Sequence, residues 1–511
     1  MIKVTLSHVF VALLAGVFLA LASWFWLMLH RFAVPEPQWL SLVQDLQYGL
    51  VPQLRWMTAQ AVAQGFMPPL LLLYLINDGR QADGARVLRG ARLVDGKTLA
   101  KRTRLKERKG VVPQVAIAGV PIPHGCESGH FLLVGSTGTG KTVAADELLA
   151  GALARRDRCI VVDPNGHALA LFGREGDIVL NPFDVRCPGW SLFNEIGKDY
   201  DADRLAASIV PDAADVSSQH WHGYARTLLA ETMRSMLQVG ENSTERLLHW
   251  STQASAAELG VFLAGSATAK VQFEPGNEKV LAGARFILAD HLGCFQHLRP
   301  GDFSLRTWLE SGKGNLFLTW REDMLSSLKP LASGWVDILI AATLSLPEGN
   351  AKPLWLVLDE LASLKRLNTL EDGLTKGRKH GLRVIAGLQS VAQLNSIYGI
   401  HSATTLRSCF RNLLALGCSN ADPETAKVIS EGLGESEVER NQVSRSSTSR
   451  RADASSTRSK HRTVEPLVLP SQLMSLAPLN GYLKLAGDFP VAKVRLKPID
   501  REVRVKPFTE R

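Results

Sequence analysis

The 511-residue sequence predicts an α/β protein built on a doubly wound, parallel sheet. Short apolar runs without polar alternation recur along the chain, as expected for parallel strands that are buried on both faces. Helical patterns separate these runs, and that alternation is typical of βαβ units. The runs are His130–Val134, Arg158–Val162, Asn315–Thr319, Leu354–Leu358, Arg383–Leu388 and Asn412–Leu416.

Composition excludes several classes of protein. Hydrophobic residues make up 46% and charged residues 21% of the chain, which is ordinary globular usage and excludes a disordered or fibrous protein. The six cysteines include no C-x-x-C pair, so neither a disulfide framework nor a zinc ribbon is expected. We therefore expect a reduced, cytoplasmic main body.

Two apolar segments at the N-terminus, within residues 1–77, predict a transmembrane hairpin. Val9–Leu29 is an uncharged, predominantly apolar run of 21 residues, long enough to cross a hydrocarbon core of ~30 Å. Its alternative is a cleaved signal peptide ending near Ala20–Ala22, although the run continues past that point. Trp56–Ile76 contains two glutamines and two prolines, so we expect a kinked span, with a re-entrant or interfacial segment as the alternative.

The net charge of +9 is concentrated in one stretch. Residues 80–109 hold eleven Lys/Arg against three acidic residues, whereas residues 1–79 balance and the remaining 402 residues carry only +1. Positive charge beside a span marks its cytoplasmic side. We therefore predict a basic juxtamembrane linker at 78–110 and a membrane protein of two spans. Both termini would be cytoplasmic, and a short external loop would lie at 30–55.

The cytoplasmic part divides by composition into a first nucleotide-binding segment at 111–186, an all-α domain at 187–300 and a second nucleotide-binding segment at 301–511. Ala, Leu and Met dominate the middle segment, where Ser255 and Glu258 have the spacing of a helix capping box. Near the C-terminus, Tyr482–Leu485 and Val491–Leu496 predict an antiparallel hairpin at a sheet edge.

The segment 440–463 has a composition of its own. It holds seven Lys/Arg, one Asp and almost nothing apolar, which predicts a mobile loop because so little apolar surface is available for burial. A loop that contacts nucleic acid is the alternative.

A phosphate-binding loop follows the first predicted strand. Its pattern is G-x-x-x-x-G-K-T, and a helical pattern follows at Val143–Ala154, which is the structural context that this motif requires. The backbone N–H groups would surround the phosphates of ATP, the lysine would reach the β- and γ-phosphates, and the final threonine would ligate Mg²⁺. The loop comprises Gly135, Ser136, Thr137, Gly138, Thr139, Gly140, Lys141 and Thr142.

Two further strand ends supply candidate catalytic residues. Asp359 and Glu360 follow the apolar run Leu354–Leu358, which suits an aspartate that holds Mg²⁺ through water and a glutamate that activates the attacking water. The alternative for this pair is a helix-start signal. Gln389 follows Arg383–Leu388 and is placed to contact the γ-phosphate; an ordinary polar residue at the sheet edge is its alternative.

In this order, the motifs resemble the type IV coupling proteins of bacterial conjugation and type IV secretion, a TraD/TraG/TrwB-like family, and specifically its TrwB-like branch. Besides the two-span N-terminus and the P-loop, the resemblance rests on longer motifs. These are Ile160–Gly166, Asn181–Asp184, Trp190–Glu195, Leu318–Asp323, Leu358–Ser363, Thr375–Lys379 and Gly387–Ser390.

The resemblance implies a RecA-like P-loop NTPase core with an inserted all-α domain, assembled as an inner-membrane homo-hexamer. Its activity would be DNA-dependent ATP hydrolysis that passes relaxase-bound single-stranded DNA to the type IV secretion channel. Arg378 matches the arginine that completes a neighbouring subunit's site, and Trp221 matches an aromatic residue near the channel mouth. From the residues alone, Arg378 is a solvated basic turn, and Trp221 is equally consistent with the core of a helical domain.

Two other functions are consistent with the same motifs. One is a double-stranded DNA translocase of the chromosome-segregation type, although this sequence has no winged-helix tail. The other is a substrate receptor or assembly ATPase of the secretion system that does not pump DNA. Dependence of turnover on single-stranded DNA distinguishes these functions.

Overall fold

A computed structural model describes most of the chain, and its contacts divide that chain into two compact units. The described residues are 6–31, 56, 58–69, 86–105, 112–213, 215, 217–273, 276–349, 352–446 and 455–511. One unit comprises Met1–Gly90 with Ser436–Glu465, and the other comprises Ala91–Glu435 with Pro466–Arg511.

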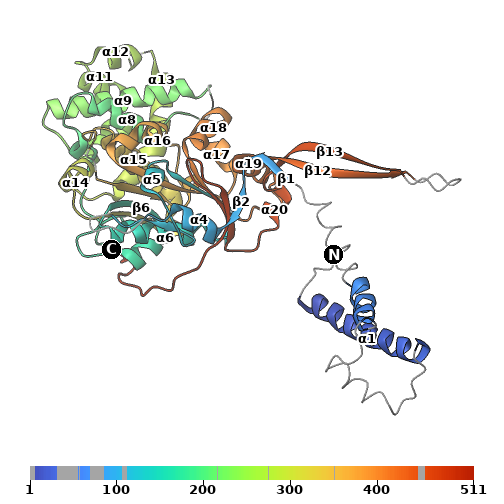
Figure 1. Cartoon of the computed structure of the whole chain (residues 1–511). Helices are drawn as coiled ribbons and strands as arrows, with labels where there is room; N and C mark the ends of the chain where they lie inside the picture. The colour runs from blue at the N-terminus through green and yellow to red at the C-terminus, as the bar shows by residue number, and fades with distance from the viewer. Residues whose placement is uncertain are drawn as a thin grey trace. The chain divides into compact units, whose positions relative to one another are not determined.

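The second unit is built on a ten-stranded sheet (Figure 1). Its spatial order is β2-β15-β14-β11-β5-β10-β9-β6-β8-β7. The strands are β2 Leu93–Asp95, β5 Phe131–Val134, β6 Arg158–Pro164, β7 Ile178–Leu180, β8 Leu316–Trp320, β9 Leu354–Leu358, β10 Leu382–Leu388, β11 Asn412–Ala415, β14 Asn480–Lys484 and β15 Val491–Arg495. All six predicted strands are present, each within two residues of its predicted bounds at either end.

The seven strands from β11 to β7 are parallel, as predicted. The predicted hairpin is also present, because β14 pairs antiparallel with β15 and with β11. Its predicted place at the sheet edge is wrong. The short strand β2 pairs parallel with β15, from Leu93 opposite Val491, and is itself the edge. A three-residue strand is too short to stand out in the sequence.

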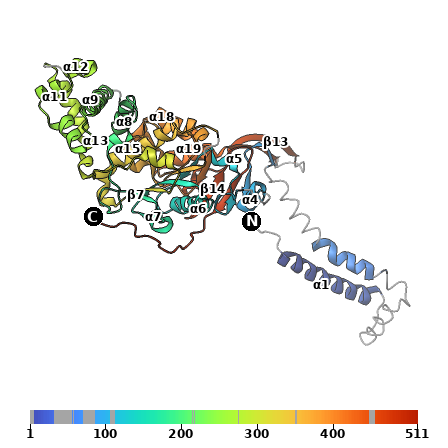
Figure 2. The same cartoon turned by 90° about the vertical axis from the view of Figure 1, so that its left-hand side faces the viewer.

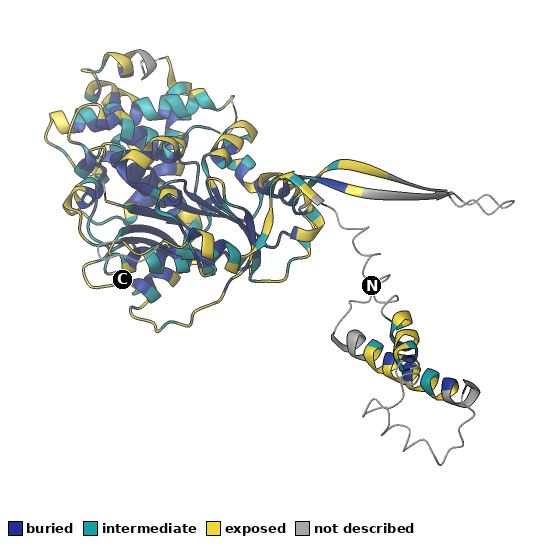
Figure 3. Ribbon diagram, viewed as in Figure 1, coloured by how far each residue is buried: buried dark blue, intermediate teal, exposed yellow. Residues whose placement is uncertain are grey.

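Both faces of the sheet are buried (Figure 3). Alternate residues of β5 enter different apolar clusters: Phe131 and Leu133 pack with α6, whereas Leu132 and Val134 pack with α15 and its neighbours. Helices therefore cover both faces. Elements near the sheet include α4 Gly96–Thr103, β3 Ala116–Ile117, β4 Val120–Pro121, α5 His124–Glu127, α6 Lys141–Ala154, α7 His167–Phe172, α14 Leu305–Ser311, α15 Leu325–Thr343, α16 Leu370–Lys376, α17 Val391–Tyr398, α18 Ile400–Cys409, α19 Pro423–Leu433 and α20 Pro470–Met474.

Between β7 and β8, all the regular elements in the described residues are helical (Figure 2). Leu229, Met233 and Met236 of α9 are fully buried, and the predicted capping box forms because Ser255 and Glu258 each bond the other's backbone N–H. The helices are η2 Leu192–Glu195, α8 Asp201–Ile209, α9 Gln219–Gln238, α10 Thr244–Leu248, η3 His249–Gln253, α11 Ala256–Phe262, α12 Ala267–Phe273, α13 Glu278–Leu292 and η4 Gly293–His297.

The segment predicted as a mobile loop, 440–463, differs from that prediction. Two long strands, β12 Glu435–Ser446 and β13 Ser455–Pro466, pair in a three-stranded sheet with β1 Arg86–Gly90. Backbone pairing and ion pairs, rather than apolar burial, support these strands, which is why the apolar content failed to predict them. Residues 447–454 lie outside the described residues.

At the N-terminus, α1 Leu6–Arg31 packs against helical residues 58–69. Ser23 Oγ donates to Gln64 Oε1 at 2.6 Å, and Trp24 Nε1 donates to Thr58 Oγ1 at 3.2 Å. However, within the described residues we find no helix with the length and apolarity that crossing a membrane requires. The predicted two-span hairpin and inner-membrane location are corrected accordingly.

Candidate functional site

The loop between β5 and α6 has the backbone of an anion-binding site. Gly138 and Gly140 have φ values of 77° and 113°, and a Cβ at Gly140 would lie 2.9 Å from Leu496 Cδ1, so only glycine fits there. Within the described residues, the backbone N–H groups of Gly138, Gly140, Lys141 and Thr142 meet no protein acceptor. These donors lie at the N-terminus of a 14-residue helix, where the helix dipole favours an anion.

The side chain of Lys141 folds back over this loop. Its Nζ donates to the carbonyl oxygens of Gly135 at 2.8 Å and Ser136 at 3.3 Å, and the side chain is buried. Burial lowers the pKa of Lys141, while the carboxylates of Glu360 and Asp359 oppose that shift. The cation is thus held at the loop and lies within electrostatic reach of two carboxylates.

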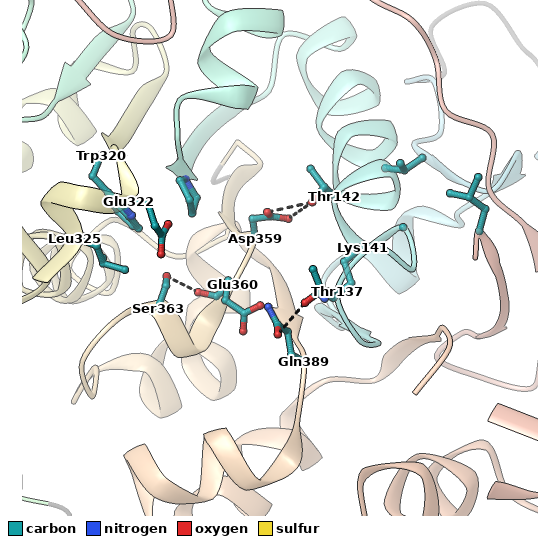
Figure 4. Close-up of a pocket in the computed structure, with 15 residues that line it drawn as sticks. Thr137, Lys141, Thr142, Trp320, Glu322, Leu325, Asp359, Glu360, Ser363 and Gln389 are labelled. Carbon is teal, nitrogen blue, oxygen red and sulfur yellow. Dashed lines mark hydrogen bonds between the residues drawn. The ribbon is translucent and has the colours of Figure 1, made fainter. Parts of the chain in front are cut away.

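Thr142 and Asp359 connect the start of α6 with the end of β9, which are far apart in sequence. The Thr142 hydroxyl, at the start of α6, donates to Asp359 Oδ1 at 3.1 Å and Oδ2 at 3.2 Å, and Asp359 directly follows β9 (Figure 4). Burial raises the pKa of Asp359, and the bond from Thr142 partly offsets that shift. A hydroxyl and a carboxylate brought together are oxygen ligands suited to Mg²⁺.

Glu360 and Gln389 lie beside this pair because β10 runs between β5 and β9 in the sheet. Gln389 Oε1 accepts a bond from Thr137 Oγ1 at 3.3 Å. Burial raises the pKa of Glu360, and a hydrogen bond with Gln389 partly offsets that rise. Glu360 Oε1 is buried and has no hydrogen-bond partner within the described residues, so this oxygen is free for a ligand.

A pocket of about 460 Å³ connects these groups. The sequence predicts the P-loop and three acceptors of this pocket but not its opposite wall. Pro164, the last residue of β6, and Trp320, the last residue of β8, form that wall together with Glu322 and Leu325. The carboxyl ends of both strands lie on the same side of the sheet as the carboxyl end of β9, because the three strands are parallel (Figure 4). The polar run after the strand Asn315–Thr319 was the available signal, because side chains that follow parallel strands gather at one edge.

Two predicted residues lie away from this pocket. Arg378 is exposed on η7 Gly377–His380, which precedes β10, whereas Gln389 follows β10; the strand separates them by about 20 Å. Trp221, on α9, is half-buried against α13, because a Cβ at Gly283 would lie 2.5 Å from its ring. Packing against α13 therefore accounts for at least part of the burial of the Trp221 ring.

Clustered metal ligands are absent from the described residues: no three His, Cys, Asp or Glu side chains come close enough to hold an ion. The Mg²⁺ site predicted at Thr142 and Asp359 does not require such a cluster, because Mg²⁺ bound with a nucleotide keeps several waters and uses one or two protein ligands.

Comparison with known proteins identifies the family. Residues 114–497 match the family model described as the type IV secretion-system coupling protein DNA-binding domain. The chain belongs to this family. The predicted family is thereby confirmed.

Solved structures agree on the fold. The plasmid coupling protein TrwB in complex with ADP and Mg²⁺ is 44% identical, with a TM-score of 0.77 over 84% of this chain and 98% of that one. TrwB with the non-hydrolysable ATP analogue ADPNP is 45% identical, with the same TM-score over 83% and 97% of the two chains. The predicted α/β core with a helical insertion is thus confirmed.

Curated relatives extend beyond this chain. Coupling protein TraD of Escherichia coli (strain K12) is 28% identical over 439 residues, which are 82% of this chain but 59% of TraD. The conjugal transfer protein TraG of Rhizobium radiobacter is 31% identical over 184 residues, 36% of this chain and 28% of TraG. The chain therefore spans about six-tenths of the length of TraD.

Proposed function

We propose that this chain is a DNA-dependent ATPase that couples a relaxase–DNA complex to a type IV secretion channel during conjugation. The carrying observation is the convergence of three parallel strand ends on one pocket. They bring free P-loop N–H groups, the Thr142–Asp359 pair and the free Glu360 oxygen together. The solved TrwB complexes with ADP and Mg²⁺ and with ADPNP support the proposal that the pocket binds an adenine nucleotide.

Each residue of the pocket has a proposed role. The P-loop N–H groups and Lys141 bind the phosphates, and Glu360, a base strengthened by its raised pKa, accepts a proton from the attacking water. Gln389, held by Thr137, orients that water or the γ-phosphate. Thr142 and Asp359 would hold Mg²⁺, which when bound neutralises charge on the transferring phosphate.

Arg378 is proposed to act on a neighbouring subunit of a homo-hexamer. Its side chain is exposed and forms no ion pair or hydrogen bond within the described residues, and it lies at the sheet end away from its own pocket. A guanidinium in that position reaches phosphate only across a subunit interface, where it stabilises charge in the transition state.

The decisive experiment measures ATP turnover of the full chain with and without single-stranded DNA, over a range of protein concentrations. We expect DNA to stimulate turnover cooperatively with concentration and Lys141→Thr to abolish it while sparing DNA binding. Stimulation by double-stranded DNA alone would favour the chromosome-segregation type of translocase. Turnover indifferent to DNA would favour the receptor or assembly ATPase.

A mixing experiment tests the role of Arg378. Lys141→Thr has a defective pocket but keeps its arginine, and Arg378→Ala keeps its pocket but lacks the arginine, so each variant is expected to be inactive alone. If the arginine acts in trans, mixed assemblies recover part of the turnover. Lys379→Ala, a neighbouring exposed cation paired with Glu348 at 3.8 Å, is the matched control and should stay active. Full activity of assembled Arg378→Ala would contradict the trans role.

A further inference from the structure

One extended segment crosses the ten-stranded sheet without a role in the proposed motor: residues 497–511, called here the strap. It follows β15, the second strand in the sheet order, and runs past α7 to end beside β7, the last strand (Figure 2). Eight interstrand spacings of ~4.8 Å make about 38 Å, and the 13 residues from Leu496 to Thr509 reach at most about 45 Å. The strap therefore has little slack.

Directly before the strap, the chain is bonded to the P-loop. Leu496 N donates to the Leu479 carbonyl oxygen at 2.7 Å, and Leu479 N donates to the Thr139 carbonyl oxygen at 2.9 Å. Leu479 lines the pocket. The Leu496 side chain lies against Gly140, where a Cβ would be 2.9 Å from it. One end of the strap is thus fixed to the side of the pocket that the P-loop forms.

The other end of the strap contacts both loops of the opposite wall. Pro507 lies against Gly166, two residues after the wall residue Pro164, because a Cβ at Gly166 would be 2.5 Å from the Pro507 carbonyl oxygen. The ring of Phe508 faces Arg321, whose guanidinium carbon is 5.2 Å from the ring centroid. Arg321 lies between two wall residues in the sequence.

The two wall loops are also bonded to each other. Asn165 N donates to the Trp320 carbonyl oxygen at 2.7 Å, and Glu322 N donates to Asn165 Oδ1 at 3.2 Å. Because of these bonds, the contacts of the strap with either loop act on the whole wall.

The motif Asn181–Asp184, which the proposed motor also leaves unexplained, anchors the strap. The Asp184 side chain is fully buried, and its Oδ2 accepts from Thr509 N at 3.0 Å and from Arg186 Nη2 at 2.6 Å. Arg186 Nη1 in turn donates to the Lys506 carbonyl oxygen at 2.9 Å. The two strap residues that contact the wall lie between Lys506 and Thr509, so their position is fixed from both sides.

The strap adds little to the hydrophobic core. All 15 of its residues are described, and none of them is buried. Its contacts include backbone hydrogen bonds and two pairings of an arginine with an aromatic ring: Phe508 with Arg321, and Arg501 with Phe172 of α7 at 5.1 Å. A segment that buries so little surface but contacts both walls of the pocket suits a role in positioning rather than in core stability.

We propose that the strap positions the pocket wall that faces the P-loop, with Pro507 and Phe508 as the positioning residues. The inference rests on the proposed function, because the position of this wall matters only if a nucleotide binds in the pocket. The proposed catalytic residues follow β9 and β10 rather than β6 or β8. The strap should therefore act on the affinity for nucleotide more than on the rate of hydrolysis.

The first test moves the strap off the wall. To reach ordinary contact distance, an alanine Cβ at Gly166 has to displace Pro507 by about 1 Å, and this should lower kcat/KM for ATP by about 10–10²-fold, mainly through KM. Gly166 has a φ of 68°, so alanine also adds backbone strain. Gly176→Ala is the matched control, because Gly176 has a φ of 87° and open space beside it, and it should keep wild-type kcat/KM. Equal effects of Gly166→Ala and Gly176→Ala would overturn the role of the strap.

A second test removes one contact without adding backbone strain. Phe508→Ala should raise the Kd for N-methylanthraniloyl-ADP with Mg²⁺ by about two- to fivefold, whereas Phe508→Tyr keeps the ring and should bind as wild type. Arg501→Ala removes the matching pair on α7 and should leave the Kd unchanged. Urea unfolding of the same variants separates the two roles, because a purely structural strap would change unfolding and not the Kd.

Hydrogen–deuterium exchange tests the strap without any substitution. Coupling between two sites is reciprocal, so ADP with Mg²⁺ should slow amide exchange by about fivefold or more at residues 504–511, all of them described and none of them lining the pocket. If nucleotide binds while exchange in the strap stays unchanged, the positioning role is overturned but the proposed motor is not. A full chain that binds no nucleotide would overturn both.

Discussion

The two ends of the parallel sheet carry similar charged residues but use them differently. At the carboxyl ends of β5, β9 and β10, acidic groups and backbone donors surround a pocket and several lack partners, including Glu360 Oε1. At the amino ends of β6, β9 and β10, Glu127 is 1% exposed and receives Arg155 at 2.7 Å and Arg383 at 3.2 Å. Asp157 there accepts from Arg155 at 2.5 Å and from Trp355 Nε1 at 2.9 Å.

This difference distinguishes a candidate ligand site from a network that stabilises the fold. Buried charge is costly unless it is paired, and at the amino end the protein supplies the partners itself. At the carboxyl end, the groups without partners in the described part of the chain are backbone N–H donors and a carboxylate oxygen, which have the chemistry to bind a phosphate and a cation. Substitutions at the carboxyl end should therefore change turnover, and those at the amino end should change stability.

The largest effect is expected for Glu360→Gln. Loss of the proposed general base should reduce ATP turnover by about 10²–10⁴-fold. The free energy of unfolding should change little, because Glu360 Oε1 has no partner to lose within the described residues. Turnover and urea unfolding are measured on the same samples. Glu322→Gln, another carboxyl in the pocket wall, is the control, and near-wild-type turnover in Glu360→Gln would place the base elsewhere.

At the amino end of the sheet, Glu127→Gln should lower stability rather than act on turnover directly. Removing the charge leaves Arg383 and part of Arg155 buried without their carboxylate, and this should lower the free energy of unfolding by about 3–5 kcal/mol. Urea unfolding measures this change. Asp323→Asn breaks the exposed pair with Arg321 and should cost much less stability, because solvent screens that pair. Equal losses of unfolding free energy in Glu127→Gln and Asp323→Asn would show that burial does not make the Glu127 pairs more important for stability than the exposed pair.

Asp337, on α15, has a buried carboxyl group of which only one oxygen accepts hydrogen bonds among the described residues. Its Oδ1 accepts from Thr369 N and Oγ1, both at 2.8 Å, but Oδ2 has no partner within the described residues. Burial raises the pKa of Asp337 from 3.8 to about 6. The folded state then holds a proton that the unfolded state releases, so stability is full below about pH 4 and declines as pH rises through about 6.

The predicted loss over that pH range is up to about 3 kcal/mol, since each pKa unit corresponds to about 1.4 kcal/mol. Unfolding at pH 4, 5, 6 and 7 measures it. Asp337→Asn cannot ionise and should show a flatter profile. Parallel profiles for wild type and Asp337→Asn would show that the carboxylate is not destabilised by burial.

The smallest effect is expected for Trp355→Phe in the amino-end network. This change removes the indole donor to Asp157 but leaves the bond from Arg155, so stability should fall by about 1 kcal/mol. Urea unfolding followed by circular dichroism measures it. A loss as large as that of Glu127→Gln would mean that the indole, rather than the ion pairs, holds the network together.

Much of the site was predictable because its signals are local. The P-loop is recognised from the spacing of residues within a single short segment. The apolar runs before Asp359 and Gln389 indicate buried parallel strands, whose carboxyl ends lie on the same side of the sheet. The pocket wall at Trp320 and Glu322 was missed, because which strand ends face one another depends on strand order rather than on sequence position. The strands β12 and β13 were missed because pairing between polar strands leaves no apolar signal.

The sequence by itself determined the chemistry of this protein: a phosphate-binding loop, acidic strand ends, a helical insertion and where the positive charge lies. These follow from residue type and short-range periodicity, which a linear chain carries in full. Tertiary structure alone decided that β10 separates β5 from β9 and that Thr142 meets Asp359. It also decided that Arg378 and the pocket lie at opposite ends of β10. Such placements depend on long-range pairing and packing, whose energies no local pattern of residues records.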